Sequence, residues 1–214
     1  MSWRLYVIVD GAACGGRDPA GVAAQAIRGG ADVLQLRDKS ASTAQFIRTA
    51  ERLLAVTRPA GIPLIINDRS DVALAVGADG VHLGQDDMPV TAARILLGPE
   101  RIIGKSTHSL EQALAADQEP VNYLALGPIY ATPTKPDYGC VGPKLIPAVA
   151  SRVRHPLVVI GGIEEATLEE VARAGAERVA VVRAVCAAPD PAAAARNLKT
   201  RLAQFVRATP AVRL

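Results

Sequence analysis

Residues 30–39 read GADVLQLRDK, a segment that combines a helix end, a buried strand and a polar strand end. Glycine suits the left-handed backbone position that follows a helix. The apolar residues after Asp32 predict a strand, in which successive side chains point to opposite faces. Gln35, Arg37 and Lys39 therefore share one face of a strand whose other face carries leucine side chains.

A glycine, an alanine and an acidic residue recur together at 77–79 and 175–177, each time between a predicted helix and a predicted strand. Short apolar runs predict eight strands, at residues 5–10, 32–38, 63–69, 80–85, 101–106, 123–130, 156–163 and 178–185. Helical patterns lie between them, at residues 19–28, 42–56, 109–116, 164–174 and 191–207. Such apolar strands favour parallel pairing in a sheet that is covered on both faces.

Eight strand–helix units in a chain of 214 residues predict the α/β class and a single (β/α)8 TIM barrel. A doubly wound open sheet is the alternative that the same alternation allows. No linker or low-complexity segment interrupts the pattern. We therefore expect residues 1–214 to form one TIM-barrel domain.

Composition and charge exclude several function classes. A formal charge of +3 and 3% aromatic residues give neither the basic stripe nor the stacking aromatics of a nucleic-acid-binding protein. No apolar run is long enough to span a membrane, and the first residues lack the apolar region of a signal peptide, so we expect a cytoplasmic protein. The three scattered cysteines indicate neither a disulfide framework nor a metal cluster. The sequence leaves open whether the chain forms a homo-oligomer.

Active sites of TIM barrels lie at the carboxyl ends of the strands, and the predicted strand ends are polar. Arg37 and Lys39 raise the question of what neutralises two partly buried cations, because an isolated buried charge costs several kcal/mol. Salt bridges to nearby carboxylates such as Asp68 are one answer. A phosphate or pyrophosphate bound by these cations is the other.

Carboxylates at two neighbouring strand ends suggest a metal site. Asp68 ends one predicted strand, and Asp86 and Asp87 follow the next. Mg²⁺ is commonly held by one or two carboxylates together with substrate phosphates, so Asp68 and one of the second pair suit it. Helix capping or turn formation is the alternative for Asp86 and Asp87, and we favour it for Asp86.

Glycines after the seventh predicted strand suggest a second anion site. Gly161 and Gly162 allow backbone N–H groups to approach an anion closely, and Val182-Arg183 ends the eighth predicted strand. Loops after strands seven and eight of TIM barrels frequently bind phosphate. A tight turn without a ligand is the alternative.

These motifs together resemble the thiamine phosphate synthase family over nearly the whole chain. The pieces that carry the resemblance, in order, are QLRDK, IINDR, GVHLGQDD, IIGKSTHS, LGPIYATPTK, VVIGGI and RVAVVRAV. The family joins a pyrimidine, carried as a pyrophosphate ester, to a thiazole phosphate and releases pyrophosphate. The resemblance implies a Mg²⁺-dependent transferase that acts on small molecules.

The resemblance also implies roles for particular residues. Those that would hold the pyrimidine pyrophosphate are Gln35, Arg37, Lys39, Asn67, Ser106 and Lys135, of which Lys39, Ser106 and Lys135 would be catalytic. Those that would bind Mg²⁺ are Asp68 and Asp87. Those that would surround the thiazole phosphate are Thr132, Thr134, Gly162, Val182 and Arg183.

Arg183 departs from the family pattern, because a serine is expected at its position in many members. His108 resembles a functional histidine of thiazole tautomerases, which share this barrel, so an isomerase is the alternative function. A sensor of the same intermediates is a third possibility. We interpret His82 as structural and His155 as a surface residue.

Overall fold

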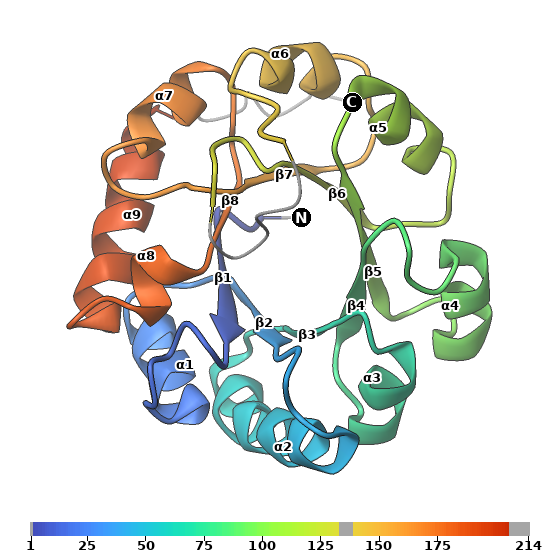
Figure 1. The fold of residues 1–214 in the computed structure, drawn as a ribbon, viewed down its shortest axis with the longest axis vertical. Coiled ribbons are helices and arrows are strands. Elements are labelled where there is room, and N and C mark those ends of the chain that lie inside the picture. Colours follow the sequence, from blue (N-terminus) through green and yellow to red (C-terminus); the bar gives the residue numbers. More distant parts are fainter. Residues whose placement is uncertain (1, 133–138, 206–214) are drawn as a thin grey trace, which may run out of the picture.

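A computed structural model describes residues 2–132 and 139–205 and shows a closed barrel of eight parallel strands in the order of the chain (Figure 1). The strands are β1 (Leu5–Asp10), β2 (Val33–Arg37), β3 (Leu64–Asn67), β4 (Gly80–Leu83), β5 (Ile102–Thr107), β6 (Tyr123–Leu126), β7 (Leu157–Ile160) and β8 (Val179–Val181). Because β1 pairs with β8 as well as with β2, the barrel is closed. The predicted (β/α)8 TIM barrel is confirmed, and the open sheet is wrong.

The helices form a ring outside the barrel (Figure 1). They are α1 (Pro19–Arg28), α2 (Thr43–Ala60), α3 (Ser70–Val76), α4 (Val90–Leu97), α5 (Leu110–Ala116), α6 (Leu145–Ala150), α7 (Leu168–Arg173), α8 (Arg183–Cys186) and α9 (Pro191–Phe205). The long α9 packs against α1 and α7 and so covers the junction between the first and last units. Within the described residues, no helix combines the length and the apolar character that a membrane span requires.

Several predicted strands were too long, and glycine and proline explain most of the difference. Strand β6 stops at Leu126, before the Gly127-Pro128 pair, whose proline lacks a backbone N–H. Strand β7 stops at Ile160, because Gly161 has a φ of 103° that a strand does not allow. The predicted strand at 178–185 overlaps the short helix α8 as well as β8.

Two separate clusters of apolar side chains stabilise the fold. The larger one lies between the strands and the surrounding helices. The smaller one fills the inside of the barrel, and it consists of Tyr6, Ile8, Val33, Ile65, Tyr123, Val158 and Ala180 with Trp3 packed against them. This inner cluster fills the interior of the barrel, so we expect a ligand site at the carboxyl-terminal ends of the strands.

The acidic residue of the recurring glycine-alanine-acid pattern has a defined structural role. Asp32, which precedes β2, accepts hydrogen bonds through Oδ2 from the backbone N–H groups of Arg4 (2.9 Å) and Leu5 (3.0 Å) at the start of β1. Its other oxygen accepts from Lys199 Nζ of α9 at 2.5 Å. One carboxylate therefore joins the beginnings of two strands to the outer ring.

The same arrangement recurs around the barrel. Asp79, before β4, accepts from Leu64 N at the start of β3 (2.8 Å), and Asn122, before β6, accepts from Ile103 N of β5 (2.8 Å). Glu177, the third acidic residue of the pattern, instead pairs with its neighbour Arg178. At three places, the residue before an even-numbered strand thus satisfies donors of the preceding strand.

We expect Asp32→Ala to destabilise the barrel by about 1–3 kcal/mol, because it leaves buried backbone donors without an acceptor. In a chain of this size, each kcal/mol lowers Tm by about 2–4 °C. Urea unfolding followed by circular dichroism would measure the change. Glu169→Ala is the control, since its ion pair with Arg173 on the surface of α7 is worth at most about 0.5 kcal/mol. Equal stability losses in both variants would contradict the proposed role of Asp32.

Candidate active site

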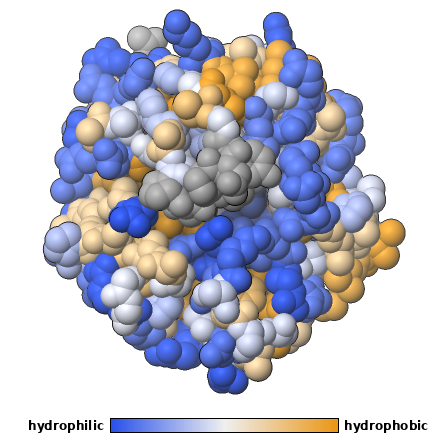
Figure 2. Space-filling view, viewed as in Figure 1, coloured by the Kyte–Doolittle hydropathy of each residue, from blue (hydrophilic) through white to orange (hydrophobic). Residues whose placement is uncertain are grey.

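A cavity of about 280 Å³ opens at the carboxyl ends of the strands. Its lining includes side chains of β2 to β5, namely Gln35, Arg37, Asn67, His82, Ser106 and Thr107. On the other side, it is lined largely by loop residues after β6, β7 and β8, among them Gly127, Thr132, Gly161, Gly162, Val182 and Arg183. Figure 2 shows hydrophilic surface around the middle of the face that it displays. The cavity therefore has a wall of polar side chains and a wall rich in exposed backbone.

Arg37, at the end of β2, forms an ion pair with Asp10, the residue beside it at the end of β1. Only 5% of the Asp10 side chain is exposed, and its second oxygen accepts from Ala13 N at 3.0 Å. A carboxylate therefore neutralises this cation, but it is Asp10 rather than Asp68. The buried Arg37 Nε has no hydrogen-bond partner among the described residues. The protein therefore leaves this buried N–H group unsatisfied.

Lys39 lies beyond the end of β2, and 59% of its side chain is exposed. Its ammonium group forms an ion pair with Asp68 Oδ2. The sequence placed Gln35, Arg37 and Lys39 on one face of a strand, but only the first two lie in the strand and line the cavity. The salt bridge that was one of the two alternatives at Lys39 is present.

The carboxyl groups of Asp68 and Asp87 are hydrogen-bonded to each other, as expected for residues that follow neighbouring strands. Asp68 has a φ of 62°, unusual for a residue other than glycine, and its N–H group donates to His82 O at 2.8 Å. Burial, and next the bond to Asp87, raise the pKa of Asp68 above its usual range, while Lys39 opposes the shift. The backbone thus holds two carboxylates close enough to share a proton.

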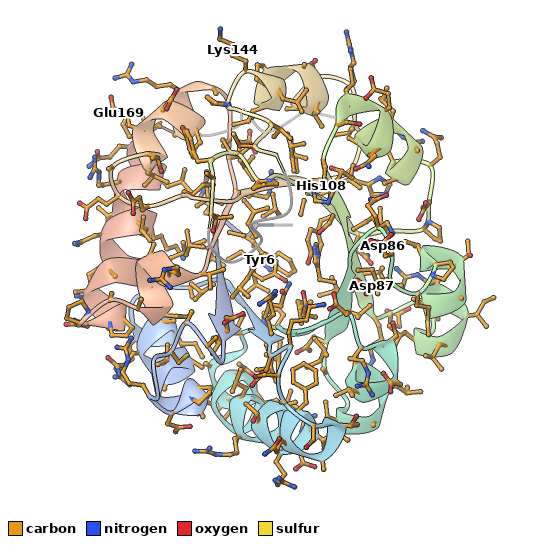
Figure 3. The ribbon with its side chains drawn as sticks, viewed as in Figure 1. Tyr6, Asp86, Asp87, His108, Lys144 and Glu169 are labelled. Carbon is orange, nitrogen blue, oxygen red and sulfur yellow. The ribbon has the colours of Figure 1, made fainter. Side chains whose placement is uncertain are left out.

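The loop that carries Asp87 is fastened at Gly84. Asp87 Oδ2 accepts from Gly84 N at 2.6 Å, and the ammonium group of the buried Lys105 donates to Gly84 O at 2.7 Å. Asp87 therefore has the turn-forming role that was one alternative, in addition to its contact with Asp68. Asp86 is exposed on the same loop after β4 (Figure 3). Lys105 had not been singled out in the sequence.

His82 is buried, as expected, but its imidazole also lines the cavity. Its two ring nitrogens lie 2.9 Å from Tyr123 Oη and 2.9 Å from Ser106 Oγ. Its strand neighbours Val81 and Leu83 belong to the outer core cluster. The period of two in β4 therefore already indicated that His82 points into the barrel.

His108, at the end of β5, lines the cavity and is labelled in Figure 3. Its Nδ1 lies 2.5 Å from Gly127 O, and its backbone N–H donates to Gln112 Oε1 at 2.7 Å. Because a carbonyl oxygen only accepts, Nδ1 carries a proton. These bonds fix the ring as part of the wall. His155, which we interpreted as a surface residue, is half-buried, lies 2.8 Å from Asp117 Oδ1 through Nδ1, and is not part of the cavity lining.

The loop after β7 requires its two glycines. Gly161 and Gly162 have φ values of 103° and 64°. A Cβ atom at Gly161 would lie 2.4 Å from Pro128 Cα, and one at Gly162 would lie 2.7 Å from Tyr130 Cβ. The backbone of Gly161 and Gly162 therefore borders the cavity directly, because neither residue has a side chain.

The remaining predicted site residues are divided between the cavity and the part of the chain that is not described. Thr132, Val182 and Arg183 line the cavity, and the Arg183 side chain is exposed at the start of α8. Thr134 and Lys135 lie outside the described residues. The structure therefore brings together the other predicted residues at one barrel mouth, with Lys39, Asp68 and Asp87 at its rim.

Comparisons with known proteins agree on one family. The family model described as thiamine monophosphate synthase matches residues 5–185. A thiamine-phosphate synthase of Chloroflexus aurantiacus is 52% identical over 93% of this chain and 92% of its own length. One of Albidiferax ferrireducens is 49% identical over 92% of this chain and 90% of its own length. The solved structure of a thiamine phosphate pyrophosphorylase from Pyrococcus furiosus has a TM-score of 0.87 and 34% identity, covering 96% of this chain and 98% of that chain.

We expect Asp68→Asn to raise Tm at neutral pH. The folded state holds the Asp68 carboxylate at a raised pKa, so ionisation destabilises the folded state relative to the unfolded chain. This cost is absent below the unfolded pKa of about 3.9 and develops as pH rises through the folded value. Thermal unfolding of both proteins between pH 4 and pH 8 would show a difference that grows with pH. A variant less stable than the wild type at pH 8 would contradict this account.

Proposed function

The chain belongs to the thiamine monophosphate synthase family, and from this premise we propose which residues of the barrel mouth perform its reaction. The enzyme is a transferase of thiamine biosynthesis. It condenses 4-amino-2-methyl-5-hydroxymethylpyrimidine pyrophosphate with thiazole phosphate, giving thiamine phosphate and pyrophosphate. The relatives do not favour the thiazole tautomerase alternative. One observation supports our assignment of residues: the same cavity has a wall of polar side chains that includes Arg37 and a wall of backbone that includes three glycines.

The charged wall is proposed to bind the pyrophosphate. Arg37 lines the cavity and has an Nε–H group that bonds to none of the described residues, and the exposed Lys39 side chain carries an ammonium group that is paired with Asp68. Asn67 is buried and lines the cavity beside them. Lys135 is proposed to contribute a further cation. These donors neutralise the charge that develops as pyrophosphate leaves, which is the main way in which a preorganised site accelerates such a step.

Asp68 and Asp87 are proposed to hold Mg²⁺. The two adjacent carboxylates, of which Asp68 has a raised pKa, are suitable ligands, because a divalent cation would relieve their repulsion. The described residues offer no cluster of three or more acidic, histidine or cysteine ligands, so substrate phosphates would complete the coordination of a bound Mg²⁺. Bound Mg²⁺ supplies positive charge that stabilises the leaving group.

Gln35 and Ser106 are proposed to hold the pyrimidine at the bottom of the cavity. Both are buried and both line it. The amino group of the pyrimidine delocalises the positive charge left on the methylene carbon, and the thiazole nitrogen then attacks this carbon. No protein nucleophile takes part. The proposed catalytic residues are accordingly Lys39, Ser106 and Lys135, which stabilise charge and fix the reacting groups in place.

The backbone wall is proposed to bind the thiazole phosphate. The site comprises Gly162, Val182 and Arg183 together with the hydroxyl groups of Thr132 and Thr134. Support comes from the bare glycine backbone after β7 and from its position, since TIM barrels frequently bind phosphate at this place. The exposed Arg183 side chain lies at the edge of the cavity, where it can pair with a phosphate.

We also propose that residues 1–214 act as one domain in the cytoplasm, as a homo-oligomer or a monomer, and without a nucleic-acid or membrane partner. The barrel and its outer helices extend over nearly all of the described chain, which supports one domain. The proposed substrates are small phosphorylated molecules, which suits a cytoplasmic enzyme.

We expect Asp87→Asn to reduce the rate of pyrophosphate release by about 100-fold or more, equivalent to about 3 kcal/mol of transition-state stabilisation. Asparagine keeps an acceptor for Gly84 N–H and removes the charge that would bind Mg²⁺. The readouts are pyrophosphate release and calorimetric Mg²⁺ binding in the presence of pyrophosphate. Asp86→Asn is the matched control, because this neighbouring carboxylate is exposed and is not assigned to the site. Full activity of the wild type in excess chelator would refute the metal site.

We expect Lys39→Ala and Arg183→Ser to affect opposite substrates. Loss of a charge-assisted bond costs about 1.5–3 kcal/mol, which is about 10- to 150-fold in KM. Lys39→Ala should raise KM for the pyrimidine pyrophosphate alone, and Arg183→Ser should raise KM for the thiazole phosphate alone. Steady-state kinetics with each substrate varied in turn would measure both. If either variant affected both substrates equally, two separate anion sites would be excluded.

A further inference from the structure

Five side chains form a continuous hydrogen-bonded chain through the interior of the barrel. Gln35 Nε2 donates to Tyr6 Oη at 2.7 Å, and Tyr6 Oη lies 3.0 Å from Tyr123 Oη. Tyr123 Oη lies 2.9 Å from His82 Nδ1, and His82 Nε2 lies 2.9 Å from Ser106 Oγ. These residues come from β2, β1, β6, β4 and β5, so the chain connects one side of the barrel with the other. Figure 3 shows Tyr6 near the middle of the barrel.

The packing around the two tyrosines fixes their hydroxyl groups. Trp3 packs edge-on against the rings of Tyr6 and Tyr123, with ring centroids 6.0 and 5.8 Å apart. A Cβ atom at Gly104 would lie 2.1 Å from Tyr123 Cζ, so only glycine there allows this ring position. Burial raises the pKa of both tyrosine hydroxyls well above their usual value. Each hydroxyl therefore keeps its proton and can donate one hydrogen bond.

Because Gln35 donates the first hydrogen bond, every later bond in the series must point the same way, away from Gln35. Tyr6 Oη accepts from Gln35, and Tyr123 Oη is the acceptor that the described residues offer for its proton. Tyr123 then donates to His82 Nδ1, so the neutral imidazole carries its proton on Nε2. His82 Nε2 donates to Ser106 Oγ. The hydroxyl proton of Ser106 is not used within the chain, and Ser106 lines the cavity.

We propose that Tyr123 and His82 are positioning residues that fix Ser106 as a donor and Gln35 Oε1 as an acceptor toward the pyrimidine, and thereby determine specificity. Gln35 uses its NH₂ group for Tyr6, which leaves Oε1 on the other side of the amide. The inference rests on the proposed function only for the identity of the ligand. The direction of the hydrogen-bonded chain follows from the protein itself.

An acceptor on one wall and a donor on the other are complementary to an aminopyrimidine. Its amino group donates to Gln35 Oε1, and a ring nitrogen accepts from the Ser106 hydroxyl. A pyrimidine with an oxo group in place of the amino group would turn a carbonyl oxygen toward Gln35 Oε1. Two buried acceptors would then face each other without a proton, which a site of this kind rejects strongly. The hydrogen-bonded chain therefore selects an aminopyrimidine over an oxopyrimidine.

Nuclear magnetic resonance of the ligand-free enzyme tests the direction of the chain. Proton–nitrogen correlation spectra of the imidazole rings report which nitrogen is protonated, and the sequence contains only three histidines to assign. We expect His82 to carry its proton on Nε2 at pH 8, and we expect Tyr123→Phe to give a mixture of tautomers. A proton on Nδ1 in the wild type would overturn the proposal, because the chain would then run from Ser106 toward Gln35. No substrate is needed, so this result is independent of the proposed function.

Kinetics with two pyrimidine pyrophosphates test the specificity. We expect Tyr123→Phe to raise KM for the amino substrate about tenfold, the effect of one hydrogen bond. It should also lower the ratio of kcat/KM for the amino substrate to kcat/KM for the oxo analogue. KM for the thiazole phosphate should not change. Trp3→Phe is the matched control, because it alters the packing on both tyrosines but removes no group of the chain. The proposal would be overturned if Tyr123→Phe left this ratio unchanged, or if Trp3→Phe lowered it as much as Tyr123→Phe does.

Discussion

The ion pair between Arg37 and Asp10 is the interaction on which the geometry of the site depends. A guanidinium group at the inner edge of a barrel needs a carboxylate, since a buried charge without a partner is strongly destabilising. Asp10 supplies that carboxylate from the adjacent strand, in register with Arg37. The pairing holds the Arg37 side chain at the cavity and still leaves its Nε without a partner among the described residues. The protein can thus keep a guanidinium group in place at the cavity before any anion is bound.

The barrel mouth has two halves, which differ in the kind of group that they present to a ligand. Strands β2 to β4 present charged side chains whose partners are other side chains of the site. The loop after β7 presents backbone that is kept bare by glycine. A side-chain wall with carboxylates suits a pyrophosphate that arrives with a metal ion, whereas backbone amides suit a phosphate monoester. The two substrates are therefore distinguished by different kinds of donor, which fixes their relative orientation.

The sequence predicted the barrel because the alternation of apolar strands and helices recurs eight times and the acidic residues at 32 and 79 mark strand starts. It also predicted that Asp68 and Asp87 would lie close together, since both follow neighbouring strands. It did not predict Asp10 as the partner of Arg37, because register between strands depends on the closed barrel. Tyr123 was missed, and His82 was interpreted as structural without a link to the site, for a similar reason: in the sequence both are ordinary members of buried strands, and only the folded barrel joins them.

The bottom of the cavity, at Tyr6, Tyr123 and His82, has satisfied hydrogen bonds, whereas its rim, at Asp68 and Asp87, has unfavourable interactions. On the floor, each of the two tyrosine hydroxyls and the His82 ring takes part in the hydrogen-bonded chain, and full satisfaction of such buried groups makes them rigid. At the rim, Asp68 has a positive φ and a raised pKa, and it lies beside a second carboxylate. A neutral ring needs fixed donors and acceptors, because it contributes little electrostatic energy of its own. A pyrophosphate with its metal contributes a great deal, so the rim can carry interactions that are unfavourable until these ligands bind. The stability lost at the rim is therefore the source of part of the affinity for the charged end of the substrate.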